Sequence, residues 1–199
     1  MRVTSIMACG LAAMLSGFLV EPLAAQTAEQ LTFIPSGGRT LLTDIANSKP
    51  PADELKALLT TKRSREEWSS YLNAHKTVPG LQRLGDNERL TLADYLAFHM
   101  PLPANQVPAN PANTGWTRTL PKDGRDLALA DCQGCHIITV VVTQARTKSH
   151  WVGTMGTPSH SVIKMTAEER EELASYLELN AAIPIEKVPE ELRASGATY

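Results

Sequence analysis

The chain has 199 residues, a formal net charge of −2, 43% hydrophobic residues and only 5% aromatic residues. Its charges form neither a basic stripe nor a block of one sign, which excludes nucleic acid as a partner. This composition is typical of a soluble globular protein, and the length is enough for one compact domain or two small ones.

Residues 1–25 are predicted to be a secretory signal peptide. Arg2 gives a basic start, residues 3–20 lack charged side chains, and Ala24-Ala25 provides a small-residue cleavage site. A membrane anchor is the alternative, but the apolar stretch is short and is interrupted by glycine and serine. We therefore expect a periplasmic protein without a stable membrane anchor.

Several short helices are predicted in the first half of the chain. Residues 53–60 follow two prolines and favour a helix. Ser64, followed three residues later by Glu67, has the form of a capping box that starts another helix. Three residues at helical spacing predict a further apolar helix face: Leu92, Tyr95 and Leu96. Residues 26–104 are therefore expected to form one helical unit.

A linker is predicted at residues 105–117, within a stretch rich in Asn and Ala. Four prolines punctuate this region: Pro101, Pro103, Pro108 and Pro111. The linker leads to residues 118–199, which comprise a second unit and a C-terminal tail. In this unit we expect a helix over residues 124–135 and another behind the capping box of Thr166 and Glu169.

The run of residues 132–136 has the CxxCH spacing of covalent haem attachment. The thiols of Cys132 and Cys135, about one helical turn apart, can each add to one haem vinyl group, and His136 can bind the iron from the proximal side. A redox disulfide or half of a zinc site is the alternative for a CxxC pair. A zinc site would need a second ligand pair, and the remaining cysteine, Cys9, lies in the predicted signal peptide. Residues 137–142 are β-prone and apolar, and we expect them to pack near the haem edge.

The second half of the chain repeats the first. Residues 35–41 recur at 121–127, and later matches follow in the same order: Arg63 and Trp68 with Arg146 and Trp151, Glu88-Arg89 with Glu169-Arg170, Leu92-Ala93 with Leu173-Ala174, Tyr95-Leu96 with Tyr176-Leu177, and Pro103 with Pro184. The offsets are 86, 83 and 81 residues, so we interpret the chain as two copies of one helical unit. One continuous helical domain with coincidental matches is the alternative. The haem-attachment positions correspond to Ala46, Lys49 and Pro50 in the first copy, which therefore lacks the groups that attach haem.

The second unit resembles a class I c-type cytochrome domain over about residues 118–183. The resemblance is carried by the CxxCH motif and by a terminal helix with Glu169, Leu173, Tyr176 and Leu177. It implies a small helical fold around one haem c, with a distal methionine from a loop before the last helix. The doubled arrangement resembles a dihaem cytochrome whose N-terminal haem is lost. We therefore expect an all-α fold of two tandem cytochrome-c-like units, of which only the C-terminal one binds haem.

The distal iron ligand is predicted to be a methionine. Met165 is preferred, because it directly precedes the helix cap at Thr166 and is therefore firmly held. Met155, in a glycine-flanked segment, is the first alternative, and the second is His150, His160 or an open site. A thioether ligand raises the reduction potential of haem iron relative to a second histidine.

These features predict a periplasmic cytochrome that carries single electrons to and from redox partner proteins. One alternative is a fixed subunit of a periplasmic dehydrogenase or reductase, with the haem-free half as a docking module. Another is a haem enzyme or small-ligand sensor with an open distal site. The sequence contains no nucleophile–base pair or phosphate-binding loop, so no catalytic residue is assigned, and electron transfer is favoured over catalysis.

Overall fold

The computed structural model describes residues 30–110, 113–133 and 135–193. Across these residues every regular element is a helix, which confirms the predicted all-α fold class. The predicted signal peptide, residues 1–25, lies outside the described part of the chain. No helix in the described ranges is long and apolar enough to cross a membrane.

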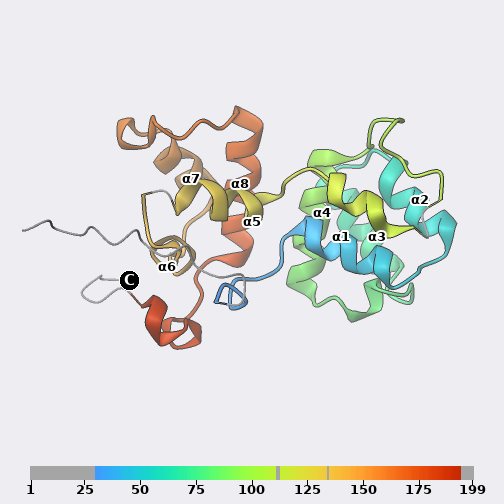
Figure 1. The fold of residues 1–199 in the computed structure, drawn as a ribbon, viewed down its shortest axis with the longest axis horizontal. Helices are drawn as coiled ribbons and strands as arrows, with labels where there is room; N and C mark the ends of the chain where they lie inside the picture. The colour runs from blue at the N-terminus through green and yellow to red at the C-terminus, as the bar shows by residue number, and fades with distance from the viewer. Residues whose placement is uncertain (1–29, 111–112, 134, 194–199) are drawn as a thin grey trace, which may run out of the picture.

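The helices fall into two groups that lie side by side along the longest axis of the molecule (Figure 1). The first group consists of α1 (Gly38–Asn47), α2 (Ala52–Thr60), α3 (Arg65–Ala74), the 3₁₀ turn η1 (Leu81–Arg83) and α4 (Asp86–His99). Helices α1 and α3 pack against α4 around the fully buried side chains of Trp68 and Leu92. The 3₁₀ helix η2 (Thr114–Thr119) joins this group, since Trp116 and Leu120 pack against its core.

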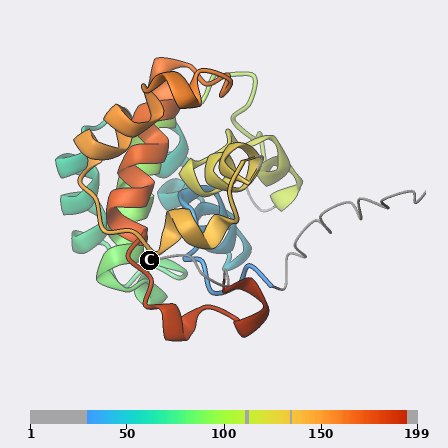
Figure 2. The same ribbon diagram turned by 90° about the vertical axis from the view of Figure 1, so that its left-hand side faces the viewer.

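The second group follows in the chain and faces the viewer in Figure 2. It consists of α5 (Gly124–Leu127), the π-helical turn η3 (Ala128–Cys132), α6 (Ile138–Val142), α7 (Lys148–Met155), the 3₁₀ turn η4 (Pro158–His160), α8 (Ala167–Asn180) and the 3₁₀ turns η5 (Ile185–Lys187) and η6 (Glu190–Leu192). Helices α5 and α7 pack against α8. The core between them includes the fully buried Leu173 and the nearly buried Trp151 and Met155.

The two groups contain corresponding elements in the same order. Helices α4 and α8 both have 14 residues and begin 81 residues apart. Helices α3 and α7 begin 83 residues apart, and α2 and α6 begin 86 residues apart. These separations equal the offsets of the sequence repeat, so the repeated residues occupy corresponding positions in the two groups.

Both predicted capping boxes are present. The backbone N–H of Ser64 donates to Glu67 Oε2 at 2.7 Å, and the N–H of Glu67 donates back to Ser64 Oγ at 3.2 Å. Thr166 and Glu169 make the same pair of bonds, at 2.7 and 3.1 Å. Each box satisfies two backbone donors that a helix start leaves without partners, and so fixes where α3 and α8 begin.

Within the β-prone residues 137–142, Ile138–Val142 form a helix and Ile137 is its N-cap. Helix α6 buries Ile138 and Val142 in the second core, and the Thr139 hydroxyl donates to the Leu192 carbonyl at 2.8 Å. Burial of one helix face against η6 overrides the local preference of the β-branched residues.

Helices α4 and α8 pack against each other and join the two groups. His99 Nε2 lies 2.8 Å from Glu172 Oε1, and Asn87 Nδ2 donates to Asn180 Oδ1 at 2.9 Å. Glu172 and Asn180 are both buried. The joint therefore depends on paired polar groups as well as on apolar contact.

Short segments cross between the groups at their ends. Leu31 and Ile34, which precede α1, are buried in the core of the second group. Leu120, which precedes α5, is buried in the core of the first group, and Val107 and Trp116 from the predicted linker pack against the same core. Each core is thus completed by residues that precede the first helix of the other group.

Candidate haem site

A cavity of about 190 Å³ opens in the second group. Residues of η3, α6, α7, α8 and the segment between α7 and α8 line it. It brings together all three functional residues of the CxxCH motif, Cys132, Cys135 and His136, with Met155 and Met165. The side chains that sequence analysis selected for haem binding therefore share one cavity, although 33 residues separate Cys132 from Met165.

The motif begins where a helix ends. The expected helix over residues 124–135 starts as α5, widens into the π-helical turn η3 and stops at Cys132. The N–H groups of Cys135 and His136 then both donate to the Cys132 carbonyl, at 3.4 and 3.1 Å. Gly134 lies outside the described residues. Single π-helical turns occur often at functional sites, and here one places the first thiol against the cavity.

The two thiols have different surroundings. Cys132 is half-buried and packs against the second core, and burial raises the pKa of its thiol to about 11. Cys135 is exposed, as is His136, which follows it. Neither thiol forms a disulfide. Cys132 is therefore protonated at neutral pH, and both sulfur atoms remain available for covalent attachment.

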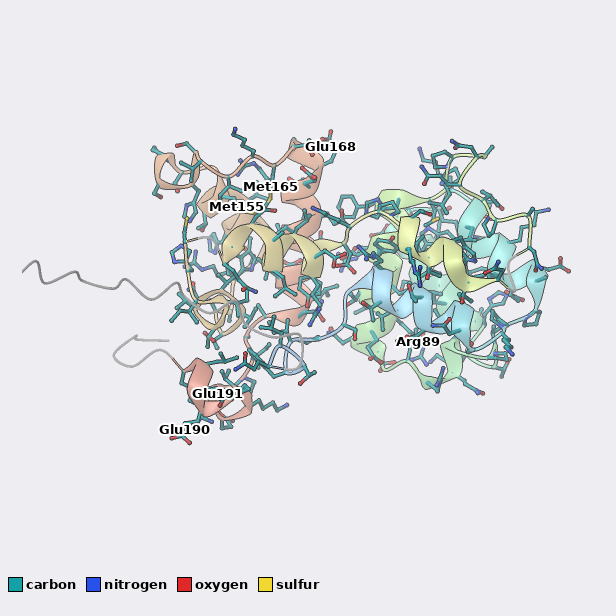
Figure 3. The ribbon with its side chains drawn as sticks, viewed as in Figure 1. Arg89, Met155, Met165, Glu168, Glu190 and Glu191 are labelled. Carbon is teal, nitrogen blue, oxygen red and sulfur yellow. The ribbon has the colours of Figure 1, made fainter. Side chains whose placement is uncertain are left out.

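The two candidate methionines approach the cavity from different elements. Met155 is the last residue of α7 and is buried, whereas Met165 directly precedes the N-cap Thr166 of α8 and is half-buried. Figure 3 shows the two side chains near each other, between the end of α7 and the start of α8. Both thioethers line the cavity, so the choice of Met165 over Met155 stays a prediction.

Only one of the two alternative histidines lines the cavity. The ring centroid of His160 lies 6.1 Å from that of His136, and its Nδ1 lies 2.8 Å from Thr157 Oγ1. His150 is exposed on the first turn of α7 and lines a different hollow. The structure therefore favours His160 over His150 as an alternative distal ligand.

Apolar side chains form most of the remaining wall, among them Val141, Leu173 and Leu177. Trp151 also lines it, and its buried indole N–H has no hydrogen-bond partner. The indole N–H of Trp68 in the first group is also buried without a hydrogen-bond partner, so this unpaired donor is a feature that both groups share. An apolar wall lowers the local dielectric and excludes water, which is the environment that haem iron needs for a stable axial thioether.

Sequence analysis did not assign two arginines that the structure places around the cavity. Arg146 lines it, donates to Thr154 Oγ1 at 2.7 Å and lies over the Trp151 ring, with 5.1 Å between its Cζ and the ring centroid. Arg170, on the first turns of α8, does not line the cavity itself but donates to the carbonyls of two residues that do, Met155 at the end of α7 and Ile163 in the segment that follows. The signal for both was the repeat, since Arg63 and Arg89 occupy the corresponding positions.

The corresponding region of the first group is filled with side chains. Ala46 stands in the position of Cys132, and Leu72 and Leu84 stand in those of the two methionines; all three are buried in the first core. Helix α2 has 9 residues against 5 in α6, and three leucines on it are buried in that core: Leu55, Leu58 and Leu59.

The donor set in the second group fits a covalently attached haem. It offers two free thiols and an imidazole from the motif, two thioethers from other elements, and an apolar wall. In the part of the chain that the structure describes, no group of three or more His, Cys, Asp or Glu side chains could hold a metal ion directly. A zinc ion held by side chains alone takes three or four such ligands, whereas haem iron takes its remaining ligands from the porphyrin. Comparisons with protein-family models, curated proteins and solved structures returned no match.

Proposed function

We propose that this protein is a periplasmic c-type cytochrome that carries single electrons through one haem, held covalently in its second group of helices. The observation that carries the proposal is the single cavity lined by Cys132, Cys135, His136 and two methionines. We further propose that the two groups are tandem cytochrome-c-like units and that the first has lost its haem. The matching element order and the buried leucines at its former ligand positions support this view.

In this proposal Cys132 and Cys135 would hold the haem through thioether bonds, each formed by addition of one S–H across one vinyl group. Such an addition would need no oxidant, because each thiol supplies both the sulfur and the hydrogen. His136 would serve as the proximal iron ligand and Met165 as the distal one. The bound haem would supply a one-electron couple between ferric and ferrous iron.

The remaining side chains control the surroundings of the iron. Val141, Leu173 and Leu177 exclude water and so favour the iron state with less net charge. Trp151 and Arg146 form the part of the wall near the start of α7, where Arg146 is the one Arg or Lys among the lining residues. A cationic side chain at the wall can pair with a haem propionate.

A second candidate function is that of a fixed subunit in a periplasmic oxidoreductase complex. The observation in its favour is that the first group keeps a fully packed core and a polar joint to the second group although it has no donor set of its own. A free carrier has no evident use for such a module, whereas a subunit can use it to bind a dehydrogenase or reductase. Size-exclusion chromatography of native periplasmic extract separates the two, because a carrier elutes alone and a subunit elutes within a stable complex.

The experiment that tests the proposed function is haem staining of the purified protein on a denaturing gel. A haem-positive band is expected for the wild type, and its loss is expected when Cys132 and Cys135 are both replaced by Ala. Mass spectrometry should find one haem per chain. Haem that extracts freely into acidic organic solvent would overturn covalent attachment, and two haems per chain would overturn the loss of the first site. Rapid binding of carbon monoxide to the reduced wild type would instead indicate an open distal site and a sensor or enzyme.

A further inference from the structure

We propose that Arg170 is a positioning residue that clamps the segment between α7 and α8 and thereby sets the strength of the axial thioether bond. The inference rests on the proposed haem site, because it concerns how firmly this chain presents a methionine to the iron. Arg170 touches neither candidate thioether; it acts through the backbone at Met155, the end of α7, and at Ile163, shortly before Met165.

The guanidinium of Arg170 bonds the last residue of α7 and a point within the segment that follows it. One nitrogen donates to the carbonyl of Met155, the residue that ends α7, at 2.5 Å, and the other donates to the Ile163 carbonyl at 2.8 Å. Met155 is itself a candidate ligand, and Ile163 lies two residues before Met165. The fork of one arginine thus joins the end of α7 to the C-terminal part of the segment, which is a geometry that the planar guanidinium provides and a lysine does not.

The anchor of this clamp is rigid. Arg170 lies directly after the capping box of Thr166 and Glu169, and its own N–H donates to the Thr166 carbonyl at 3.2 Å. Helix α8 is the element against which α5 and α7 pack. A bond from Arg170 therefore ties the segment to the helix on which α5 and α7 both pack.

Apart from the packing of Met165 against the second core, the segment between α7 and α8 has few described contacts to other elements. Val162 is 69% exposed. The other hydrogen bonds described between residues 156 and 163 are local and join residues at most four apart, such as His160 to Thr157 and Ile163 to His160. Among the described hydrogen bonds of residues 156–163, the bond from Arg170 to Ile163 is therefore the connection to α8.

The clamp should raise the effective concentration of the thioether ligand at the iron. An axial ligand on the same chain binds its metal with a strength that depends on how much freedom its segment must lose. A segment already held near the bound geometry loses less freedom, so its ligand competes better against outside ligands. Removing Arg170 should weaken the thioether bond although every donor atom to the iron is retained.

The first group supplies a matched control. Arg89 occupies the position of Arg170, is buried, and donates to the Leu81 carbonyl at 3.4 Å and to Asp86 Oδ1 at 3.2 Å. Figure 3 shows it in the group that lies away from both methionines. Its replacement should reduce stability in the same way as that of Arg170, without any effect on an axial ligand.

The test compares wild type, Arg170→Ala, Arg170→Lys and Arg89→Ala as full-length haem-loaded proteins. Haem staining establishes attachment, the weak near-red thioether-to-ferric-iron absorption reports the axial bond, and imidazole titration of the ferric protein measures how easily that bond is displaced. Arg170→Ala should raise the imidazole affinity by about tenfold or more, which corresponds to the loss of one hydrogen bond made by a charged donor. The near-red band of Arg170→Ala should also disappear at a lower pH than the band of the wild type. Arg170→Lys, which can keep one of the two bonds, should lie between wild type and Arg170→Ala.

Arg89→Ala should leave imidazole affinity within about twofold of wild type while lowering the unfolding temperature. An imidazole affinity of Arg170→Ala equal to that of wild type would overturn the clamp while leaving the proposed function intact. If Arg170→Ala does not accumulate, Arg170→Lys is the variant that tests the clamp. An imidazole affinity of Arg170→Lys equal to that of wild type then overturns the clamp. A wild type without covalent haem would overturn the proposed function itself, and this inference with it.

Discussion

The hydroxyl of Tyr176 donates a hydrogen bond of 2.6 Å to the carbonyl of Pro35, 141 residues earlier in the chain. The corresponding tyrosine of the first group, Tyr95, donates to the corresponding carbonyl of the second, that of Pro121, at 3.0 Å. Each terminal helix is therefore bonded to the start of the other repeat, and the exchange is reciprocal. Gly38 and Gly124 make the arrangement possible, because a Cβ on either would lie within 2.3 Å of the Cβ of the tyrosine on its own terminal helix.

Removing either hydroxyl should loosen the joint between the groups. Tyr176→Phe leaves the Pro35 carbonyl without this donor, and we expect a loss of about 1 kcal/mol in the free energy of unfolding, measured in urea. Tyr95→Phe should cost about the same. The double variant should lose close to the sum, because the two bonds are separate contacts at the same joint. A double variant as stable as wild type would show that these bonds do not hold the groups together.

Replacing Met165, the proposed distal ligand, should change the spectrum of the haem-loaded protein. Met165→Ala should abolish the near-red absorption, open the iron to exogenous ligands and shift the reduction potential, because water, hydroxide or His160 must take the vacated position. Met155→Ala should keep the band and lose stability instead, by about 2 to 4 kcal/mol, since Met155 is buried in the second core. The reverse pattern would assign the axial bond to Met155.

The stability of the joint should depend on pH through Asp94. Asp94 is buried on α4, pairs with Arg65 at 2.8 Å and has one carboxylate oxygen without a hydrogen-bond partner. Burial raises its pKa to about 6, because desolvation outweighs the attraction of Arg65.

A raised carboxyl pKa means that the folded protein binds this proton more tightly than the unfolded chain. The contribution of this proton binding to the free energy of unfolding is therefore fully present below about pH 4 and is lost as pH rises through about 6. Asp94→Asn removes the titration, so its stability relative to wild type should rise by roughly 2 kcal/mol between pH 4 and pH 7. Urea unfolding of both proteins at the two pH values measures this difference, and a constant difference would contradict the raised pKa.

The first group should fold alone when its own core is complete. A fragment of residues 35–121 includes Trp116 and Leu120, which pack against the first core, whereas a fragment of residues 26–104 lacks both. We expect the longer fragment to be helical, cooperative in thermal unfolding and colourless. The shorter one should be less stable by at least about 2 kcal/mol, the burial of one leucine. Two unfolded fragments would show that the halves share one core.

Local chemistry made much of the fold predictable. The capping boxes at Ser64 and Thr166 depend on residues three apart, and both are formed as expected. The all-helical content followed from the same periodic patterns. The helix at residues 138–142 could not be predicted locally, because its burial against η6 is a tertiary effect on β-branched residues.

In the candidate site, too, local sequence patterns were predictable and tertiary contacts were not. Cys132, Cys135 and His136 were selected from their spacing, and the cavity that they line is also lined by the two methionines selected from their positions before the last helix. The role of Arg170 could not be read from the sequence, since it depends on a side chain that reaches back 15 residues to a backbone carbonyl. Contacts between backbone carbonyls and distant side chains leave no pattern in composition or periodicity.

The crossing of Leu31 and Ile34 into the second core has a consequence for the order of assembly. That core also contains Leu192, so it unites some of the earliest and latest described residues of the chain. A polypeptide that is synthesised from its N-terminus can close the first core once Leu120 has been made. The second core must wait for nearly the whole chain, because it needs Leu192, and Cys132 packs against that core. The topology thus delays completion of the core beside Cys132 until synthesis of the chain is almost finished.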